Sequence, residues 1–287
     1  MTGAPAQAAR RPVLDLSATL VRRGYVCDYE VGERPLPGPD KVLTYGRPAL
    51  LAVSTVACVS TTEKVVSLTY DDGPNPEYTP QVLDALAAAG QRATFFVLVE
   101  QAERYPNLIH RIIGGGHEVA LHGIDHTRLS SLPLKKAVSL IKDGKGRLEQ
   151  VAGRRVTLFR PCYGAQTVGQ YLATRALGLE VVVWSAWARD WDSADAGVIA
   201  ERAIGSLHQG GFVLLHDHSG DGVGALDPVT GAELERGEAT RMLLRGLADR
   251  GYTSRTVGEL LNQYPAVRTV WAEKRDLNRP GGMPAST

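Results

Sequence analysis

Cysteine is scarce in this chain. Three cysteines occur among its 287 residues, Cys27, Cys58 and Cys162, and none of them form a C-x-x-C pair. A disulfide framework needs an even set of cysteines, and a cysteine zinc site needs closely spaced ones. The pattern therefore argues against both, and it fits a protein of a reducing compartment.

The chain also lacks an excess of charge of either sign. Thirty-two Lys and Arg residues stand against 31 Asp and Glu residues, which gives a formal net charge of +1. Without a strong positive field, a nucleic acid or an anionic membrane would have to be held by a local basic patch. We therefore expect neither nucleic acid nor a membrane as a partner.

Long hydrophobic runs are missing as well. The longest apolar stretch, residues 49–59, is interrupted by Ser54 and Thr55 and is too short to span a bilayer, so we interpret it as a buried strand. The first 24 residues contain four arginines but no apolar run of the length found in secretory signals. These features predict a cytoplasmic location. The alternative is a later translation start, because Arg47 and the stretch after it resemble a signal sequence.

The composition that is present suits a folded enzyme-sized protein. Hydrophobic residues make up 44% of the chain, which is enough for the core of one large domain or two small ones. Turn residues dominate 34–39, so we assign residues 1–62 to a small β-rich N-terminal extension. Residues 63–264 form the main domain and residues 265–287 a C-terminal tail, whose Pro- and Gly-rich part from residue 275 we expect to be disordered.

Short apolar runs alternate with helical patterns throughout the main domain. The runs predict seven strands, at 65–69, 93–98, 118–121, 157–159, 181–185, 212–215 and 252–255. The apolar spacing predicts helices at 79–89, 107–113, 133–151, 168–177, 196–208 and 239–249, and a glycine follows several of them. This alternation predicts an α/β fold, a distorted seven-stranded (β/α) barrel, in which chemistry is expected at the carboxyl ends of the strands.

Two of the predicted strands are followed by groups that could bind a metal ion. Asp71 and Asp72 follow the first strand, and adjacent ionised carboxylates near an interior require a nearby cation or a perturbed pKa. A solvated acidic turn is the simpler alternative. His122 and His126 follow the third strand at a spacing that lets both reach one ion, although histidines bound by backbone or water are the alternative. Two histidines and one carboxylate leave positions on zinc for water and substrate.

Further polar residues follow three other strands. Arg160 follows the fourth strand, Asp190 lies after the fifth, and His216 ends the sixth. Taken singly they could be an ion-pairing arginine, a capping carboxylate and an ordinary histidine. Their common position at one edge of the sheet instead predicts that they share a cleft with the aspartates and histidines above.

The same residues resemble the motifs of the polysaccharide deacetylase family, also called carbohydrate esterase family four or the NodB-homology domain. The motif-like segments are 69–74 (TYDDGP), 122–126 (HGIDH), 160–164 (RPCYG), 190–191 (DW) and 214–216 (LLH). They occur in the family's order across residues 65–263, about two thirds of the chain. The N-terminal extension is not covered.

The resemblance implies a role for each residue of the predicted cleft. Asp72, His122 and His126 would bind Zn²⁺ or another divalent transition metal. Asp71 would be the general base and His216 the general acid, with Arg160 orienting Asp71, Asp190 tuning His216, and the backbone N–H of Tyr163 stabilising an oxyanion. Tyr163 and Trp187 are further candidates for contact with the substrate, and Trp191 could present an aromatic face to a sugar, with a packing role as the alternative.

Two positions depart from the family pattern. Cys162 stands where the family commonly has a second proline, and Trp187 where it often has an acidic residue. We therefore expect a less rigid loop around Tyr163 and a more apolar groove.

The family implies a zinc-dependent carbohydrate deacetylase, a hydrolase of the acetamide of N-acetylglucosaminyl groups. Because no export signal is visible, we expect a glycosylated small molecule such as a glycopeptide antibiotic precursor as substrate; chitin or peptidoglycan is the alternative. A metal-dependent phosphohydrolase is disfavoured because no glycine-rich phosphate loop opens a helix. A non-catalytic carbohydrate-binding relative is disfavoured because Asp71 and His216 are both present.

Overall fold

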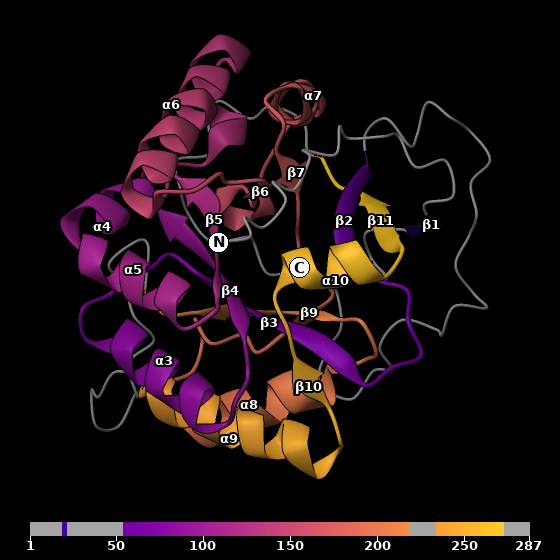
Figure 1. Ribbon diagram of the computed structural model, residues 1–287. Helices are drawn as coiled ribbons and strands as arrows, with labels where there is room; N and C mark the ends of the chain where they lie inside the picture. The colour runs from indigo at the N-terminus through magenta and orange to yellow at the C-terminus, as the bar shows by residue number, and fades with distance from the viewer. Residues whose placement is uncertain (1–18, 22–53, 219–233, 273–287) are drawn as a thin grey trace, which may run out of the picture.

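Parallel strands form the main sheet of the protein. The computed structural model describes residues 19–21, 54–218 and 234–272. The strands of the main sheet are β3 (Val65–Asp71), β4 (Ala93–Leu98), β5 (Glu118–Gly123), β6 (Leu158–Phe159), β7 (Glu180–Val181), β8 (Ala186–Trp187), β9 (Phe212–His216) and β10 (Thr253–Ser254). Their order is β7-β6-β5-β4-β3-β9-β8, with β10 paired to β3, and every pairing is parallel. The predicted distorted seven-stranded (β/α) barrel is confirmed (Figure 1).

The strands are apolar on both faces because both faces are covered. In β3, Val66 and Leu68 belong to the cluster that packs under the helices, whereas Val65 belongs to the cluster inside the barrel. In β4, Phe95 and Phe96 divide in the same way between the two clusters. Such two-sided burial is typical of parallel strands, and it explains why they read as continuous apolar runs in the sequence.

Most of the helices surround the outside of this sheet (Figure 1). The helices are α3 (Tyr78–Ala88), α4 (Val99–Arg104), α5 (Pro106–Gly114), α6 (Leu134–Ala152), α7 (Val168–Ala176), α8 (Ala196–Gly205), α9 (Arg236–Asp249) and α10 (Val257–Gln263). The six predicted helices are confirmed, with ends that differ by at most three residues. The short helices α4 and α10 were not predicted.

The barrel is closed by one extended segment, and here the prediction of a single strand at 181–185 is wrong. The segment pairs with β6 through β7 and with β9 through β8. Between these two strands, Val182 forms a bridge to Val56 of β2 (Ser54–Val59). The segment therefore crosses from one edge of the sheet to the other, and two short strands replace one.

A second, smaller sheet combines segments from both ends of the chain. Its order is β1 (Thr19–Val21), β11 (Ala266–Val270) and β2, with β11 antiparallel to β2. Every residue of β2 is buried, which confirms a buried strand in the described part of 49–59. The boundaries at 62 and 264 stay predictions, because β2 and β11 lie outside them and pair with each other. Residues 275–287, most of 1–53 and residues 219–233 lie outside the described residues.

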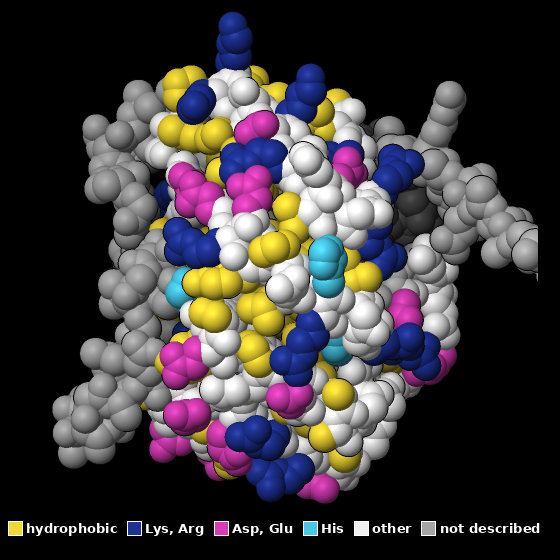
Figure 2. Space-filling model, turned by 60° about the vertical axis from the view of Figure 1, so that its left-hand side comes forward, with side chains coloured by type: hydrophobic (Ala, Val, Ile, Leu, Met, Phe, Trp, Pro, Cys, Tyr) yellow, Lys and Arg dark blue, Asp and Glu magenta, His cyan; other side chains and the backbone are white. Residues whose placement is uncertain are grey.

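The visible surface carries no concentration of one charge. Figure 2 shows Lys and Arg side chains mixed with Asp and Glu over the face that carries α4 and α5, with hydrophobic side chains scattered between them. This distribution agrees with the net charge of +1. Within the described residues, no helix combines the length and apolar character needed to cross a membrane.

Candidate active site

The carboxyl ends of neighbouring strands bring the predicted residues together. Asp71 is the last residue of β3, and His216, at the end of β9, is its partner in the parallel register. His122 lies near the end of β5. In the sheet, β4 separates β5 from β3, on the side of β3 opposite to β9. Asp72 follows β3 with a left-handed φ of 76°, which turns the chain out of the strand.

Three side chains converge on one point beside β3. Asp72 Oδ1 lies 3.3 Å from His122 Nε2 and 3.3 Å from His126 Nε2. The Nδ1–H of His122 donates to the carbonyl of Arg160 at 2.8 Å, which leaves Nε2 as the ring nitrogen directed at Asp72. Burial alone would raise the pKa of Asp72, but the hydrogen bond from His122 and the charges of His216, His122 and His126 hold it well below its usual range.

This donor set fits a divalent transition metal. Two imidazole nitrogens and one ionised carboxylate are ligands that zinc accepts, and they leave coordination positions for water and substrate. The hydrogen bond that orients His122 is typical of metal-binding histidines.

Cys162 lies next to the same histidines. Its Sγ and the ligating nitrogens of His122 and His126 are within 4.8 Å of one another. The thiol donates to the carbonyls of His122 and Asp125, at 3.5 and 3.7 Å, and burial raises its pKa. A protonated thiol directed at carbonyls is a poor ligand, so Asp72 is the better third donor.

Asp71 is held by a buried ion pair. Arg160 is fully buried, and its Nη1 lies 2.6 Å from Asp71 Oδ1. The same guanidinium donates to Thr69 Oγ1 at 2.9 Å and to the carbonyl of Val183 at 3.0 Å, and it lies 4.0 Å above the ring of Phe96. These contacts fix Arg160, so that Asp71 Oδ2 faces the histidines, 3.9 Å from His122 Nε2.

His216 is paired with a second buried carboxylate. Asp190 accepts from His216 Nδ1 and from the His216 backbone N–H, both at 2.7 Å. Arg236 donates to the His216 carbonyl at 2.6 Å and lies 3.5 Å from Asp190. Burial lowers the pKa of His216, but the charge and hydrogen bond of Asp190 and the charges of Asp72 and Asp71 outweigh it and raise the pKa to about 9.

Aromatic side chains lie on two sides of these groups. The ring of Trp191 is 5.7 Å from that of His216, and Trp187 is 5.6 Å from Trp191. On the other side, the Tyr163 ring is 4.3 Å from that of His126. Tyr163 has a left-handed φ of 59° in the turn Cys162–Gly164. The structure therefore brings all the predicted site residues into one region.

Asp217 is a buried residue of this region that the sequence interpretation missed. Its Oδ2 accepts from Thr79 Oγ1 at 2.5 Å, and its N–H donates to the Asp71 carbonyl at 3.3 Å. Its carboxylate lies so close to Gly73 that a Cβ there would overlap it, which explains the glycine after Asp72. Burial raises the pKa of Asp217 to about 7. Its position directly after His216 is the sequence feature that could have identified Asp217 as a site residue. Arg236, 20 residues after His216, has no such feature in the sequence.

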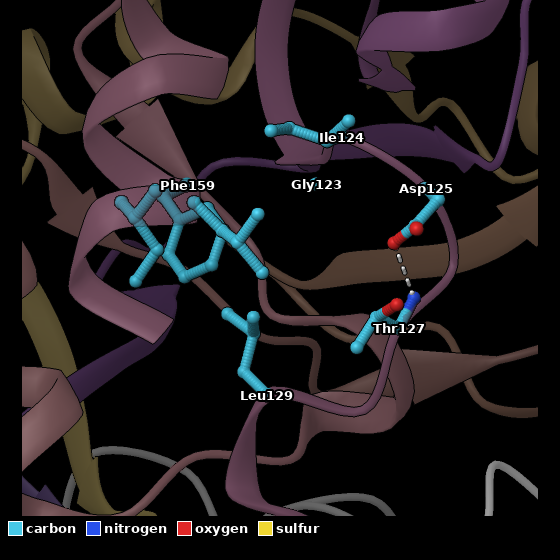
Figure 3. A pocket seen from close by; sticks show the side chains of 8 residues that line it. Gly123, Ile124, Asp125, Thr127, Leu129 and Phe159 are labelled. Carbon is cyan, nitrogen blue, oxygen red and sulfur yellow. Dashed lines mark hydrogen bonds between the residues drawn. The ribbon is translucent and has the colours of Figure 1, made fainter. Parts of the chain in front are cut away.

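A small pocket lies behind the loop that joins the two histidines. It has a volume of about 10 Å³ and is lined by loop residues Gly123, Ile124, Asp125 and Thr127 together with Leu129, Leu140, Ile141 and Phe159 (Figure 3). Asp125 accepts from the Thr127 N–H at 3.1 Å across its edge. A pocket of this size holds about one water molecule, so it is not the substrate site.

Known proteins are similar to this chain in sequence. The family model described as polysaccharide deacetylase matches residues 59–182. The peptidoglycan-N-acetylglucosamine deacetylase of Bacillus cereus is 32% identical over 206 residues, which cover 71% of this chain and 91% of that protein. A chitooligosaccharide deacetylase of Sinorhizobium fredii is 35% identical over 153 residues, 53% of this chain and 71% of that protein.

A solved structure is similar in fold. The peptidoglycan deacetylase PdaC of Bacillus subtilis matches with a TM-score of 0.60 and 31% identity, covering 70% of this chain and 91% of the solved chain. The full PdaC protein, a peptidoglycan-N-acetylmuramic acid deacetylase, is longer, and the matched region spans 40% of it. These similarities show that the chain belongs to the polysaccharide deacetylase family.

Proposed function

We propose that this protein hydrolyses the acetamide of N-acetylated amino sugars in a glycan, releasing acetate and leaving a free amine. The observation that carries the proposal is the grouping of Asp72, His122 and His126 between two buried charged pairs, Asp71–Arg160 and His216–Asp190. An amide hydrolase needs a base on one side of the carbonyl carbon and an acid on the other.

The metal ligands in this proposal are Asp72, His122 and His126. Zn²⁺ or another divalent transition metal bound there would supply Lewis-acid polarisation of the acetamide carbonyl. The backbone N–H of Tyr163 is proposed to donate to the same oxygen as negative charge develops on it.

Asp71 is proposed as the general base. Arg160 holds its Oδ1 at 2.6 Å, and Oδ2 remains on the side of the histidines to accept a proton from the attacking water. Because Arg160 is fully buried and fixed by several contacts, it keeps Asp71 oriented.

His216 is proposed as the general acid. An amide nitrogen leaves poorly unless it receives a proton, and a histidine with a pKa of about 9 carries one at neutral pH. Asp190 accepts from Nδ1, which leaves Nε2–H as the donor to the leaving nitrogen.

A glycan chain is the substrate class that the available observations favour. The relatives are named for peptidoglycan and chitooligosaccharides, and we take the same class for this chain. Trp187 and Trp191 are half-buried and suit contact with sugar faces, as does Tyr163. No feature of residues 54–218 or 234–272 favours the glycopeptide antibiotic precursor over a glycan. That substrate and the cytoplasmic location stay predictions.

Acetate release from defined substrates tests the proposal. We would compare chitin oligosaccharides, peptidoglycan fragments and an N-acetylglucosaminyl glycopeptide, before and after chelation and with zinc added back. We expect chelator-sensitive release that is faster from the glycans than from the glycopeptide. Faster release from the glycopeptide would contradict the substrate class.

One variant separates an enzyme from a binding relative. Asp71→Asn keeps the shape of the site and the three metal ligands, so it should retain zinc and lose most turnover. Turnover equal to wild type in this variant would overturn the assignment of the base.

A further inference from the structure

The C-terminal segment reaches the loop that carries Tyr163. Trp271 follows β11 directly and is 2% exposed. Its Nε1–H donates to the carbonyl of Gly164 at 2.7 Å. A residue more than 100 positions away in the sequence therefore binds the carbonyl of the residue that follows Tyr163.

Two indole rings enclose Gly164. A Cβ at this position would lie 3.0 Å from Trp271 Cζ2 and 3.1 Å from Trp184 Cη2. The two rings pack edge to face with centroids 5.2 Å apart. The loop backbone is thus in close contact with both indoles, and the glycine permits this approach.

A second contact ties the same loop to the same residue. Gln166 Nε2 donates to the carbonyl of Trp271 at 3.1 Å and to Thr55 Oγ1 of β2 at 3.2 Å. Trp271 therefore donates to Gly164 and accepts from Gln166, so both ends of the turn after Tyr163 are bound to it.

The loop needs such support because its backbone is strained. Tyr163 has φ 59° and Gly164 has φ 62°, and a left-handed conformation costs a non-glycine residue roughly 1–2 kcal/mol. A strained residue of this kind persists where its surroundings determine it. Cys162 has no ring to fix its φ, unlike Pro161 before it, so the constraint has to come from outside the loop.

We propose that Trp271 is a positioning residue, which fixes the loop 162–166 so that the Tyr163 backbone N–H is aligned with the reacting carbonyl. The proposal rests on the proposed deacetylase function. It assigns the C-terminal segment a part in catalysis. Trp271 would act through the loop and would not need to contact the substrate.

A matched pair of variants tests it. Trp271→Phe keeps an aromatic ring and loses the N–H that binds Gly164. Trp184→Phe makes the same change in the other ring of the pair, whose Nε1 has no hydrogen-bond partner in the described part of the chain. Both variants lose similar packing, but the first alone loses the hydrogen bond to the loop.

We would measure kcat and KM for acetate release, zinc affinity, and hydrogen exchange of the peptide covering residues 160–166. In Trp271→Phe, kcat should fall about 10- to 100-fold, because a misplaced oxyanion donor acts in the transition state. KM and zinc affinity should stay within about twofold, and exchange should accelerate at least about tenfold. Trp184→Phe should keep kcat within about threefold.

The outcomes are distinguishable. Unchanged kcat in Trp271→Phe, or an equal loss in Trp184→Phe, would overturn the proposal and leave a packing role. If Trp271→Phe does not fold, Gln166→Met removes the other contact and should give the same pattern in weaker form. If the wild type releases no acetate, the proposed function fails by itself, and equal exchange in wild type and Trp271→Phe would then overturn the ordering of the loop.

Discussion

The proton affinity of His216 depends mainly on the carboxylate of Asp190. Asp190 accepts two hydrogen bonds from His216 and is itself almost fully buried, so water screens the interaction little. Although burial lowers the pKa of His216, Asp190 together with the charges of Asp72 and Asp71 raises it to about 9. A general acid acts while it is protonated, so activity should be lost as the pH rises through this value.

Asp190→Asn should move that loss to lower pH. The substitution removes the negative charge that holds the proton on His216, and loss of such a partner lowers a pKa by about 1–3 units. The alkaline limb of the kcat/KM profile, near pH 9 in the wild type, should shift down accordingly. Rates measured from pH 6 to 10 would show the shift.

Asp192→Asn is the control for this profile. Asp192 lies two residues further along the same loop but pairs with Arg189 and Arg202. The alkaline limb of the Asp192→Asn profile should coincide with that of the wild type. Equal shifts in both variants would mean that Asp190 has no special coupling to His216.

The buried pair Asp71–Arg160 should be visible in stability. Arg160→Met leaves the Asp71 carboxylate buried without its partner, which costs about 3–5 kcal/mol of unfolding free energy. The double variant Asp71→Asn, Arg160→Met removes both charges and should be more stable than Arg160→Met alone. Urea unfolding of the wild type, Asp71→Asn, Arg160→Met and the double variant measures the coupling energy between the two residues. Losses of stability that add up in the double variant would contradict this coupling.

Prediction from sequence was sufficient for residues at strand ends and insufficient for their supports. Asp71, Asp72 and His216 follow apolar runs directly, so their common location could be inferred. Arg236 and Trp271 support the site from positions far along the chain, and no local pattern marks them. Their roles arise from burial and from contacts that form once the barrel has closed.

At the scale of elements, the segment 180–187 shows that an apolar run in the sequence can predict one strand where the structure has two. Its apolar residues predict one strand, but β7 and β8 pair at opposite edges and Val182 pairs with β2. The partner in the middle is β2, which precedes the strands of the main sheet in the sequence. An apolar run reports burial, and it does not tell which neighbour provides the hydrogen bonds.

The junction of β2 with the barrel predicts a large effect at one glycine. Gly210 has φ 77°, and a Cβ there would overlap the carbonyl of Val59, which lies at the end of β2. Gly178 has the same φ of 77° with nothing within 4 Å of its Cβ position. Gly178→Ala should therefore cost the left-handed backbone alone, roughly 1–2 kcal/mol.

Gly210→Ala should cost about 1–3 kcal/mol more, because β2 or the turn before β9 must shift. Chemical denaturation of both variants measures the difference. Equal losses would show that β2 can move without cost and that its contact with the barrel is loose.

At the scale of the whole molecule, the proposed metal ligands join separate parts of the fold. Asp72 follows β3, whereas His122 and His126 flank the end of β5, with β4 between these strands. Both ends of the described chain meet in the sheet of β1, β11 and β2, and Trp271 connects that sheet to the loop of Tyr163. An ion bound at the strand ends therefore has to stabilise the folded barrel as a unit.

Metal removal should lower the thermal stability of the protein. An ion that binds the folded state at 100 times its dissociation constant adds about 2.7 kcal/mol to the free energy of unfolding. Chelation should thus lower Tm by several degrees, and zinc should restore it.

Asp72→Asn should abolish this difference in Tm, since it removes a ligand, whereas Asp71→Asn should retain it. Cys162→Ser should also retain it, because the thiol donates to backbone carbonyls. A chelator-insensitive Tm in Cys162→Ser, with the wild-type shift preserved in Asp72→Asn, would replace Asp72 by Cys162 as the third ligand.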